Sequence, residues 1–449
     1  MISSRIEGLT LNIPDTNKPR VVVIGAGFGG LNTVHQLNSK NFQVVLLDKH
    51  NYHTFQPLLY QVATAGLQPD AIAGPLRNVF DSKKDFHFRI LRALSIDPDK
   101  NFVLTIAGDL HYDYLVIGIG MKTNFFGNEE IQKYSLPLKT IPDAINFRSQ
   151  LMQIMEWATM TADEATREKM LTIVIGGGGP TGVEMAGALA ELRKYVLPKD
   201  YPNVDFSKMK IYIIEGAGRL LPPMSLKSSE RAKKYLEKMG VILKPNELVQ
   251  SYDGKTVTLK SGEKIDAYTM IWSAGVKGEP IPGLKPEWIE RGKILVDEHC
   301  KVKGSNNIYA IGDIAYFKSD KYPKGLPGVA QPAIQMGKYV GKNLFAFHNN
   351  QPVNPFEYYD KGSLATVGRG KAVVDFPNGW SLGGHPAWWI WLFIHISFLI
   401  SFRNKLLVLT NWIWNYFTYD KGNRLIIRPY IRKDDSVTKQ IFAVNETDQ

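Results

Sequence analysis

The sequence contains very little cysteine. Its 449 residues include one cysteine, Cys300, and nine histidines. A single thiol cannot build a disulfide framework, a paired-thiol redox centre, or a cysteine-ligated zinc or iron–sulfur site. The one close histidine pair, His50 and His53, is more typical of a surface than of a metal site. We therefore expect no metal centre and no dithiol chemistry.

A secretory leader and a long hydrophobic run are also missing. Residues 1–20 contain Glu7 and Asp15 and no apolar core, so we do not expect a signal peptide. The stretch from Ala387 to Phe402 has no Asp, Glu, Lys or Arg, but it is only 16 residues long. A membrane-spanning helix needs roughly 20 residues, so a bilayer crossing is not expected.

The remaining composition is that of an ordinary globular chain. Hydrophobic residues make up 44% and charged residues 22%, and the length suits two or three domains with full cores. The formal net charge of +11 implies an anionic partner, which could be a nucleic acid, a lipid surface or a phosphate-bearing ligand. Charge alone does not choose among them.

A glycine-rich motif near the start predicts a nucleotide cradle. The β-branched run Val21–Ile24 is followed by GAGFGG, then by a predicted helix from Leu31 to Lys40 and a predicted strand from Phe42 to Leu47. The strand ends on Asp48, 23 positions after Gly25. Strand, tight turn, helix and a correctly spaced acid together form the full dinucleotide-binding fingerprint.

Each position of this fingerprint has a physical task. Gly25 permits the tight turn, Gly27 lets backbone N–H groups approach a pyrophosphate, and Gly30 lets the helix pack close to the strand. Asp48 can accept hydrogen bonds from an adenosine ribose.

The fingerprint occurs a second time. The strand Leu171–Ile175 leads into Gly177, Gly179 and Gly182, which again have the G-x-G-x-x-G spacing. The acid after the next predicted strand is Glu215, 38 positions after Gly177, an interval lengthened by a polar insertion. A carboxylate suits a free ribose 2′-hydroxyl and repels the 2′-phosphate of NADPH, so we expect NADH to be preferred.

The other segments predict an α/β chain. Helices are expected at 141–160 and 329–347, hairpin strands at 101–109 and 255–266, and strands running into Gly118-Ile119-Gly120 and Gly312-Asp313. The apolar stretch 52–67 can form a buried helix.

The carboxy-terminal end is rich in aromatic and basic residues. Six of the nine tryptophans follow residue 379. If the segment is one continuous helix, Ser397, Ser401, Asn404, Asn411 and Asn415 share a stripe, which is the pattern of an interfacial helix. Between Ser401 and Lys433 there are seven basic residues against the single acid Asp420, namely Arg403, Lys405, Lys421, Arg424, Arg428, Arg432 and Lys433. This composition favours an anionic membrane surface, a core helix or dimer interface being the alternative, and no nucleic-acid motif accompanies it.

With these motifs, the chain resembles type II NADH dehydrogenases, the single-subunit NADH:quinone oxidoreductases of the flavoproteins with two dinucleotide-binding domains. The resemblance runs from about Val21 to Arg424. The residues that carry it read VVVIGAGFGG, HTFQPLLYQVATAGL, GGGPTGVEMAGAL, NIYAIGDIA and AQPAIQMG. The last is the most specific, because it resembles the family's quinone-site A-Q-x-A-x-Q pattern.

The resemblance implies hydride transfer from NADH to FAD and then reduction of a membrane quinone, ubiquinone or menaquinone, without ion pumping. The implied FAD contacts are Gly25, Gly27, Phe28, Gly29, Gly30, Asp48, Lys49, His53, Gln56, Gly120, Gly312, Asp313, Gln331, Pro332 and Ala333. The implied NADH contacts are Gly177, Gly179, Pro180, Thr181, Gly182, Glu184, Glu215, Ala274 and Gly275. Glu184 is expected near the reacting rings, where it can orient NADH or handle protons, although a helix-start carboxylate is the plain alternative. Gln331 and Gln335 share a helix face and can bond a quinone carbonyl, or act as buried polar bridges.

The resemblance also implies an architecture and a location. We expect two Rossmann-like domains and a carboxy-terminal amphipathic membrane-anchoring region, with the FAD domain at 20–140 and 276–350, the NADH domain at 141–275 and the anchor at 351–449. The protein is expected to be a homodimer, peripheral on the cytoplasmic face of the inner membrane. One departure is that Gly383–Ile400 has no lysine or arginine, so a basic proton donor to quinone has no counterpart there.

Two other functions compete with this one. A different flavoprotein reductase, of the ferredoxin or sulfide-quinone type, shares the two motifs, but sulfide and disulfide chemistry needs paired cysteines. A ferredoxin reductase would lack the hydrophobic tail. A membrane-docked NADH sensor is the alternative from another class, and rapid NADH oxidation with a short-chain quinone would exclude it.

Overall fold

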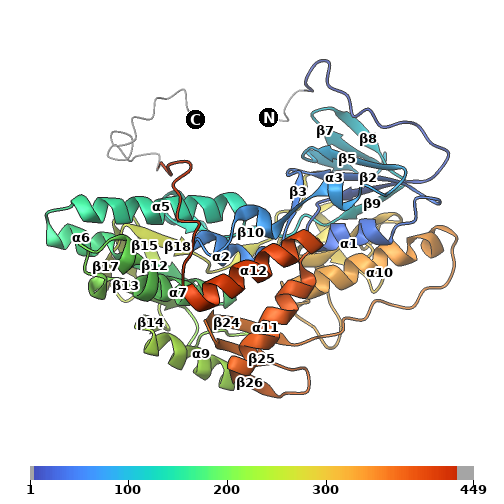
Figure 1. Cartoon of the computed structure of the whole chain (residues 1–449). Helices are drawn as coiled ribbons and strands as arrows, with labels where there is room; N and C mark the ends of the chain where they lie inside the picture. The colour runs from blue at the N-terminus through green and yellow to red at the C-terminus, as the bar shows by residue number, and fades with distance from the viewer. Residues whose placement is uncertain (1–4, 432–449) are drawn as a thin grey trace. The chain divides into compact units, whose positions relative to one another are not determined.

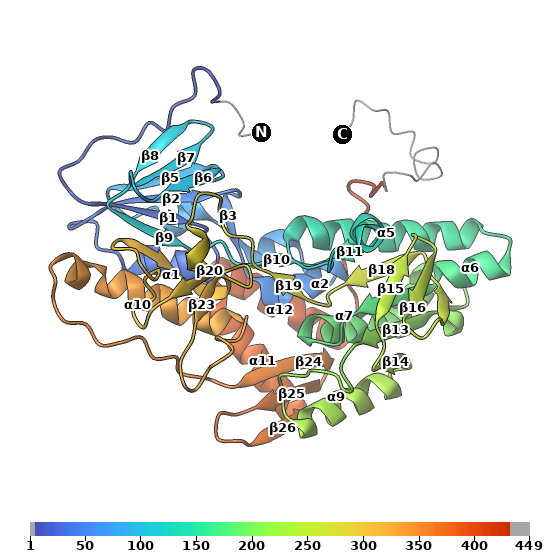
Figure 2. The same cartoon turned by 180° about the vertical axis from the view of Figure 1, so that it is seen from behind.

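The computed structural model describes residues 5–431, and this part of the chain forms two compact units. Within the described residues, the first combines 5–54, 74–122 and 276–361, and the second combines 55–73, 123–275 and 362–431. The two cartoon views follow the chain through both units (Figures 1 and 2). The domain limits expected from the sequence stay a prediction.

The first unit is built on a parallel sheet of five strands in the order β22-β9-β1-β2-β5. The strands are β1 (Arg20–Ile24), β2 (Gln43–Asp48), β5 (Phe86–Ile90), β9 (Tyr114–Ile117) and β22 (Ile308–Ala310). Val21, Val22 and Val23 are fully buried, because a parallel sheet is covered on both faces. Smaller sheets contain β6 (Ser95–Asp97), β7 (Phe102–Thr105) and β8 (Gly108–His111), and β20 (Ile289–Glu290), β21 (Lys293–Val296) and β23 (Ala315–Phe317).

Two helices of this unit pack closely together. They are α1 (Phe28–Gln36) and α10 (Ala330–His348), which lie side by side in both cartoons. A Cβ added at Gly337 would lie 2.2 Å from the backbone oxygen of Gly29, so the glycines let the two helix backbones meet. The helix α1 ends at Gln36 instead of Lys40, because the backbone turns extended at Leu37.

The second unit repeats this plan. Its parallel sheet has the order β11-β18-β12-β13-β14, with β11 (Leu136–Pro137), β12 (Thr172–Gly176), β13 (Lys210–Glu215), β14 (Val241–Pro245) and β18 (Thr269–Trp272). The predicted hairpin is present as β16 (Thr256–Leu259) and β17 (Lys264–Asp266), beside β15 (Val249–Tyr252). The principal helices are α2 (Leu59–Ala63), α5 (Ile141–Met160), α6 (Glu164–Met170), α7 (Pro180–Glu191) and α9 (Leu226–Lys238).

The bounds of α5 agree with the sequence prediction. Thr140 and Asp143 form a reciprocal capping box, in which the Thr140 hydroxyl accepts from the Asp143 N–H and the Asp143 carboxylate accepts from the Thr140 N–H. The stretch 52–67 is not the single buried helix that the sequence predicts. It contains a 3₁₀ turn with Pro57 and then α2, which has only five residues.

The carboxy-terminal part adds an antiparallel sheet and two helices to the second unit. The sheet is β24 (Ser363–Gly368), β25 (Lys371–Asp375) and β26 (Ser381–Gly384), and α11 (His385–Phe398) lies beside it (Figure 1). A second helix, α12 (Phe402–Thr418), follows. The segment is therefore not one continuous helix, because the chain breaks after Phe398 and Ser401 caps α12 by accepting from the Asn404 N–H.

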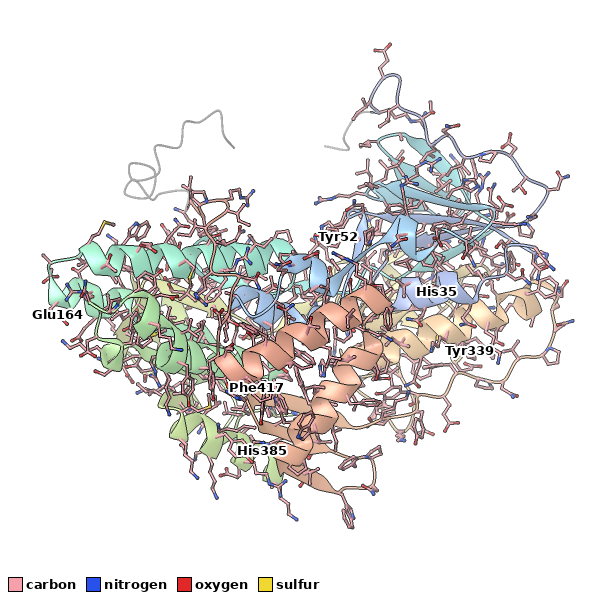
Figure 3. The ribbon with its side chains drawn as sticks, in the orientation of Figure 1. His35, Tyr52, Glu164, Tyr339, His385 and Phe417 are labelled. Atoms are coloured by element: carbon pink, nitrogen blue, oxygen red, sulfur yellow. The ribbon has the colours of Figure 1, made fainter. Side chains whose placement is uncertain are left out.

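Two asparagines of the polar stripe predicted on this segment bond other parts of the second unit. Asn404 is 3% exposed and donates to the Ala73 oxygen, and Asn415 donates to the Gly66 oxygen. The amides thus satisfy backbone carbonyls of residues 66–73. Val408 and Trp412 of α12 are also buried, whereas five of its large apolar side chains are exposed, namely Phe402, Leu406, Ile413, Trp414 and Phe417. Figure 3 labels one of them, Phe417, which is 77% exposed. Among residues 5–431, no helix has both the length and the apolar character required to cross a membrane.

Candidate active site

The first glycine-rich turn has the geometry of a phosphate cradle. Gly25 has a φ of +98°, and a Cβ there would lie 2.5 Å from the Gly118 oxygen. A Cβ at Gly30 would lie 1.8 Å from the Gly25 oxygen, so the α1 backbone must come close to the turn. At Gly27 the space around an added Cβ is open. The turn is therefore closed on its protein side and free where a pyrophosphate would approach.

The acid after β2 is tied to this turn. The two carboxylate oxygens of Asp48 accept from the Ala26 N–H at 2.6 Å and from the His50 N–H at 2.7 Å. The buried ring of His53 bonds the Ala26 oxygen through Nδ1 at 2.7 Å. Each carboxylate oxygen has a second lone pair, so Asp48 can also accept from a ribose hydroxyl.

Residues far apart in the sequence join this cradle. A Cβ at Gly312 would lie 3.0 Å from the Ala333 Cβ, and one at Gly29 would lie 3.4 Å from the Ala333 oxygen. The N-terminal turn of α10, with Gln331, Pro332 and Ala333, is thereby placed beside α1. Asp313 follows Gly312 in a 3₁₀ turn.

For the other predicted FAD residues, the structure gives their exposure, backbone conformation or place in the chain. Lys49 is exposed, and Gly120 has a φ of +66° after β9. Gln56 belongs to the second unit and stays a prediction. Gln335 forms two hydrogen bonds with the backbone of Tyr359, donating at 2.8 Å and accepting at 3.0 Å, so its amide already has a structural task.

The second cradle has the same construction. Gly177 has a φ of +109°, and a Cβ there would lie 2.8 Å from the Ala274 Cα, next to Gly275. A Cβ at Gly182 would lie 1.9 Å from the Gly177 oxygen, whereas the space at Gly179 is open. Pro180 and Thr181 begin α7, whose free N–H groups and dipole favour a phosphate.

Glu215 is tied to the second turn as Asp48 is to the first. Its carboxylate accepts from the Gly178 N–H at 2.5 Å and from the Ala217 N–H at 2.7 Å. The acid therefore reaches the glycine-rich turn although it follows Gly177 by 38 positions. The insertion between them contains α8 (Leu197–Asp200) and a short 3₁₀ turn at Phe206–Lys208.

These two turns fit the groups that the motifs imply. Each has open space at its middle glycine, N–H groups at a helix start, and an acid that can accept from ribose. The residues present therefore fit one dinucleotide in each unit.

Glu184 lies on α7 and is 9% exposed. Burial raises the pKa of its carboxyl to about 8, against the opposing effect of a hydrogen bond from the Thr366 backbone. Strand β24 reaches this position because Gly187 has no side chain: a Cβ there would lie 1.6 Å from the Val367 oxygen. Glu184 is therefore held as a neutral acid at neutral pH.

A cavity of about 110 Å³ lies in the second unit, and Glu184 is on its wall. We call it the aromatic pocket. Its aromatic residues come from α2, α11, α12 and the residue after α12, and they are Tyr60, Trp388, Trp391, Trp412, Tyr416 and Tyr419. An apolar cavity of about 150 Å³ binds benzene, so this pocket has the size of roughly one six-membered ring.

Charged groups also line the aromatic pocket. Glu191 and Glu184 lie on the same face of α7, two turns apart. The Arg369 guanidinium lies 4.2 Å from the Tyr416 ring centroid and 4.0 Å from that of Tyr419. Lys421 donates to the Ala188 oxygen at 3.4 Å, and burial lowers the pKa of its ammonium.

Of the residues that line this pocket, the sequence predicts a catalytic role for Glu184 alone. Tyr60 and Gln61 belong to the HTFQPLLYQVATAGL stretch that carries the resemblance, and the tryptophans belong to the segment predicted to lie on a membrane surface. Gly383–Ile400 brings no basic residue to the pocket, whereas Lys421 and Arg369, which lie outside that range, line it. No local pattern links these segments, because the pocket forms only when α7, β24, α11 and α12 pack together.

Comparison with known proteins shows the family and the fold. The pyridine nucleotide-disulphide oxidoreductase family matches residues 19–337, and the NDH2 C-terminal domain matches residues 360–419. The type II NADH:quinone oxidoreductases Ndh and NdhA of Mycobacterium tuberculosis are 33% and 34% identical to the chain; each match covers 91% of it and, respectively, 90% and 89% of the relative. The structure of NDH2 from Plasmodium falciparum with NADH superposes with a TM-score of 0.83 at 24% identity, covering 92% of this chain and 100% of that one.

Proposed function

Because the chain belongs to the type II NADH:quinone oxidoreductases, within the pyridine nucleotide-disulphide oxidoreductase family, we propose that it oxidises NADH and reduces a membrane quinone without pumping ions. The protein binds FAD and NADH, one in each glycine-rich cradle. Bound FAD supplies the hydride acceptor and passes two electrons on to the quinone. The observation that carries the proposal is the pair of cradles, each with a closed turn, an open middle glycine and an acid.

The residues of the cradles bind and orient the two nucleotides. Gly25, Gly27 and Gly30, with the start of α1, hold the FAD pyrophosphate, and Asp48 accepts from its ribose. Gly177, Gly179 and Gly182 do the same for NADH at the start of α7. Glu215 favours a free 2′-hydroxyl and so selects NADH over NADPH.

We place the quinone ring in the aromatic pocket. A quinone has an apolar ring and two carbonyl oxygens that accept hydrogen bonds. The Trp391 indole N–H is buried and has no partner within residues 5–431, although Trp391 lines the pocket. A buried donor without an acceptor is costly, so a ligand with a carbonyl oxygen suits this cavity. Gln331 and Gln335 remain candidates for quinone contacts, with Gln335 already bonded to Tyr359.

Glu184 donates a proton to the quinone in the aromatic pocket. Reduction of a quinone to a quinol consumes two electrons and two protons, and NADH brings one of those protons with its hydride. The second comes from solvent through Glu184, which is neutral below about pH 8 and lines the pocket. The other titratable groups on the pocket wall are Tyr60, Glu191, Arg369, Tyr416, Tyr419 and Lys421.

The apolar faces of α11 and α12 are proposed to lie on a membrane. Their exposed rings and aliphatic chains are Trp389, Phe393, Phe402, Leu406, Ile413, Trp414 and Phe417. Large aromatic side chains on a surface are typical of residues at lipid headgroup depth. Of the predicted basic residues, Arg403 pairs with Asp70 and Arg424 with Asp200, while Arg432 and Lys433 lie outside the described residues. An anionic lipid surface, a location on the cytoplasmic face of the inner membrane and a homodimer remain parts of this proposal.

Steady-state kinetics with two electron acceptors test the proposal. We expect rapid NADH oxidation with ubiquinone-1 and with ferricyanide, a hydrophilic acceptor that does not need the aromatic pocket. Ala188→Leu places a larger side chain on the pocket wall. The variant should raise the KM for ubiquinone-1 and leave the ferricyanide rate unchanged. An unchanged KM for ubiquinone-1 would refute the pocket as the quinone site.

A further inference from the structure

Three side chains beside the aromatic pocket form a chain of hydrogen bonds. The Trp412 indole Nε1 donates to Gln61 Oε1 at 2.7 Å, and Gln61 Nε2 donates to the Tyr60 hydroxyl oxygen at 2.9 Å. All three residues line the pocket. Trp412 belongs to α12 and Tyr60 and Gln61 to α2, so the chain of bonds joins two elements of the second unit.

The direction of this chain is fixed by chemistry. An indole N–H can only donate, so the amide oxygen of Gln61 must face Trp412. The amide NH₂ of Gln61 then faces Tyr60, and the phenol oxygen must act as the acceptor. The hydroxyl hydrogen of Tyr60 is therefore not used in this bond and needs an acceptor elsewhere.

No residue from 5 to 431 supplies that acceptor. The one side-chain hydrogen bond of the Tyr60 hydroxyl is the one it receives from Gln61. Glu184 lies near enough to act on Tyr60 electrostatically, but the hydrogen bond that its carboxylate receives comes from the Thr366 backbone. Tyr60 is 7% exposed, and burial with the nearby Glu184 raises the pKa of its phenol, so the hydroxyl keeps its proton.

We propose that the Tyr60 hydroxyl donates a hydrogen bond to a carbonyl oxygen of the quinone in the aromatic pocket, and that Gln61 and Trp412 are positioning residues that aim this donor. The inference rests on the proposed function and adds a specificity-determining contact to it. An electron acceptor with a ring carbonyl can accept this hydrogen bond and bind more tightly, whereas an electron acceptor without a carbonyl cannot.

Tyr60→Phe tests the donor directly. Deleting one hydrogen bond to a neutral oxygen should raise the KM for ubiquinone-1 by about 5- to 10-fold. The NADH:ferricyanide rate should not change. Tyr212→Phe is the matched control, because it removes a half-buried phenol oxygen from β13, outside the pocket, and should leave both acceptors unaffected.

Gln61→Glu tests the aiming role while Tyr60 is kept. The carboxylate still accepts from Trp412, but its other oxygen can only accept, so the Tyr60 hydroxyl turns to donate to Glu and away from the pocket. We expect the same rise in the KM for ubiquinone-1 as in Tyr60→Phe. A purely structural role predicts no such rise, because the shape and both hydrogen bonds of the chain are retained.

The three variants distinguish the proposal that the quinone binds in the aromatic pocket from the proposal that Tyr60 is its hydrogen-bond donor. If Ala188→Leu leaves the KM for ubiquinone-1 unchanged, the quinone is not in this pocket and both proposals are overturned. If Ala188→Leu raises that KM and neither Tyr60→Phe nor Gln61→Glu does so, only the Tyr60 donor is overturned. If Tyr60→Phe fails to retain flavin, Gln61→Glu alone decides.

Discussion

At the scale of single residues, the chemistry depends on where carboxylates are held. Asp48 and Glu215 each accept from a backbone N–H of the neighbouring glycine-rich turn, whereas Glu184 is buried beside an aromatic cavity. The first two could be predicted from sequence, because the fingerprint is local. The surroundings of Glu184 could not be predicted, because residues far apart in the sequence form the aromatic pocket around it. Trp412, for example, lies 351 positions from its hydrogen-bond partner Gln61.

The pH dependence of quinone reduction follows from Glu184. Its pKa of about 8 means that the carboxyl holds a proton below that pH and loses it above. We expect kcat with ubiquinone-1 to fall as pH rises through about 8. Glu184→Gln should be slower and lack this fall, while Glu184→Asp should restore part of it. A pH profile of Glu184→Gln that still falls near pH 8 would assign the titration to another group.

The same pKa affects stability. Between the ordinary pKa of 4.5 and about 8, the folded chain keeps a proton that the unfolded chain loses. The free energy of unfolding of the wild type should therefore decline with rising pH across this window relative to Glu184→Gln. Thermal unfolding of both proteins at several pH values measures this difference. Parallel melting temperatures across the window would mean that Glu184 is already ionised when folded.

Glu215→Arg should change the choice of nicotinamide cofactor. The substitution removes a carboxylate that repels the 2′-phosphate of NADPH and supplies a guanidinium that can pair with it. We expect the ratio of kcat/KM for NADH to that for NADPH to fall roughly tenfold or more, since about 1.4 kcal/mol corresponds to a factor of ten. Steady-state rates with both cofactors give the ratio, and an unchanged ratio would exclude Glu215 from the ribose contact.

At the scale of elements, a local cap fixed the start of α5, whereas the helical pattern of α12 showed only which residues share a face. The capping box of Thr140 and Asp143 marks the start of α5 in the sequence itself. The stripe of polar residues predicts that Asn404 and Asn415 share a face, and in the structure both donate to backbone carbonyls of residues 66–73. A helical pattern shows which residues share a face, and it cannot show what covers that face.

The exposed face of α12 leads to a prediction about membrane binding. Leu406→Glu combined with Phe417→Glu places two charges on side chains that are 50% and 77% exposed. We expect weaker sedimentation with vesicles of phosphatidylglycerol and phosphatidylcholine, with flavin content unchanged. Leu226→Glu on α9, where the side chain is 69% exposed, is the control and should bind vesicles as the wild type does. Equal sedimentation of all three proteins would exclude the α12 face as the anchor.

The contact between α7 and β24 predicts a destabilising substitution. Gly187→Ala would bring a Cβ within 1.6 Å of the Val367 oxygen, so one backbone must move. Overpacking of this kind costs about 1–3 kcal/mol in the free energy of unfolding. Gly422→Ala, where an added Cβ meets nothing within 4 Å, should have little effect. Chemical denaturation of the two variants measures the difference, and equal midpoints would contradict the close contact.

At the scale of the whole molecule, the chain repeats one plan. Each unit has a five-stranded parallel sheet, a glycine-rich turn after a central strand, and an acid at the end of the next strand. The duplicated fingerprint allowed both cradles to be predicted from the sequence. The aromatic pocket could not be predicted in the same way, because it needs segments 55–73 and 362–421 beside α7, and no sequence pattern records that packing.

The central claim is that electrons pass from NADH through a protein-bound flavin to a quinone. The most direct test follows the visible absorption band of the purified protein without oxygen. We predict that the protein is yellow, that one equivalent of NADH bleaches the band, and that ubiquinone-1 restores it. A colourless protein, or a flavin band that NADH does not bleach, would contradict the account.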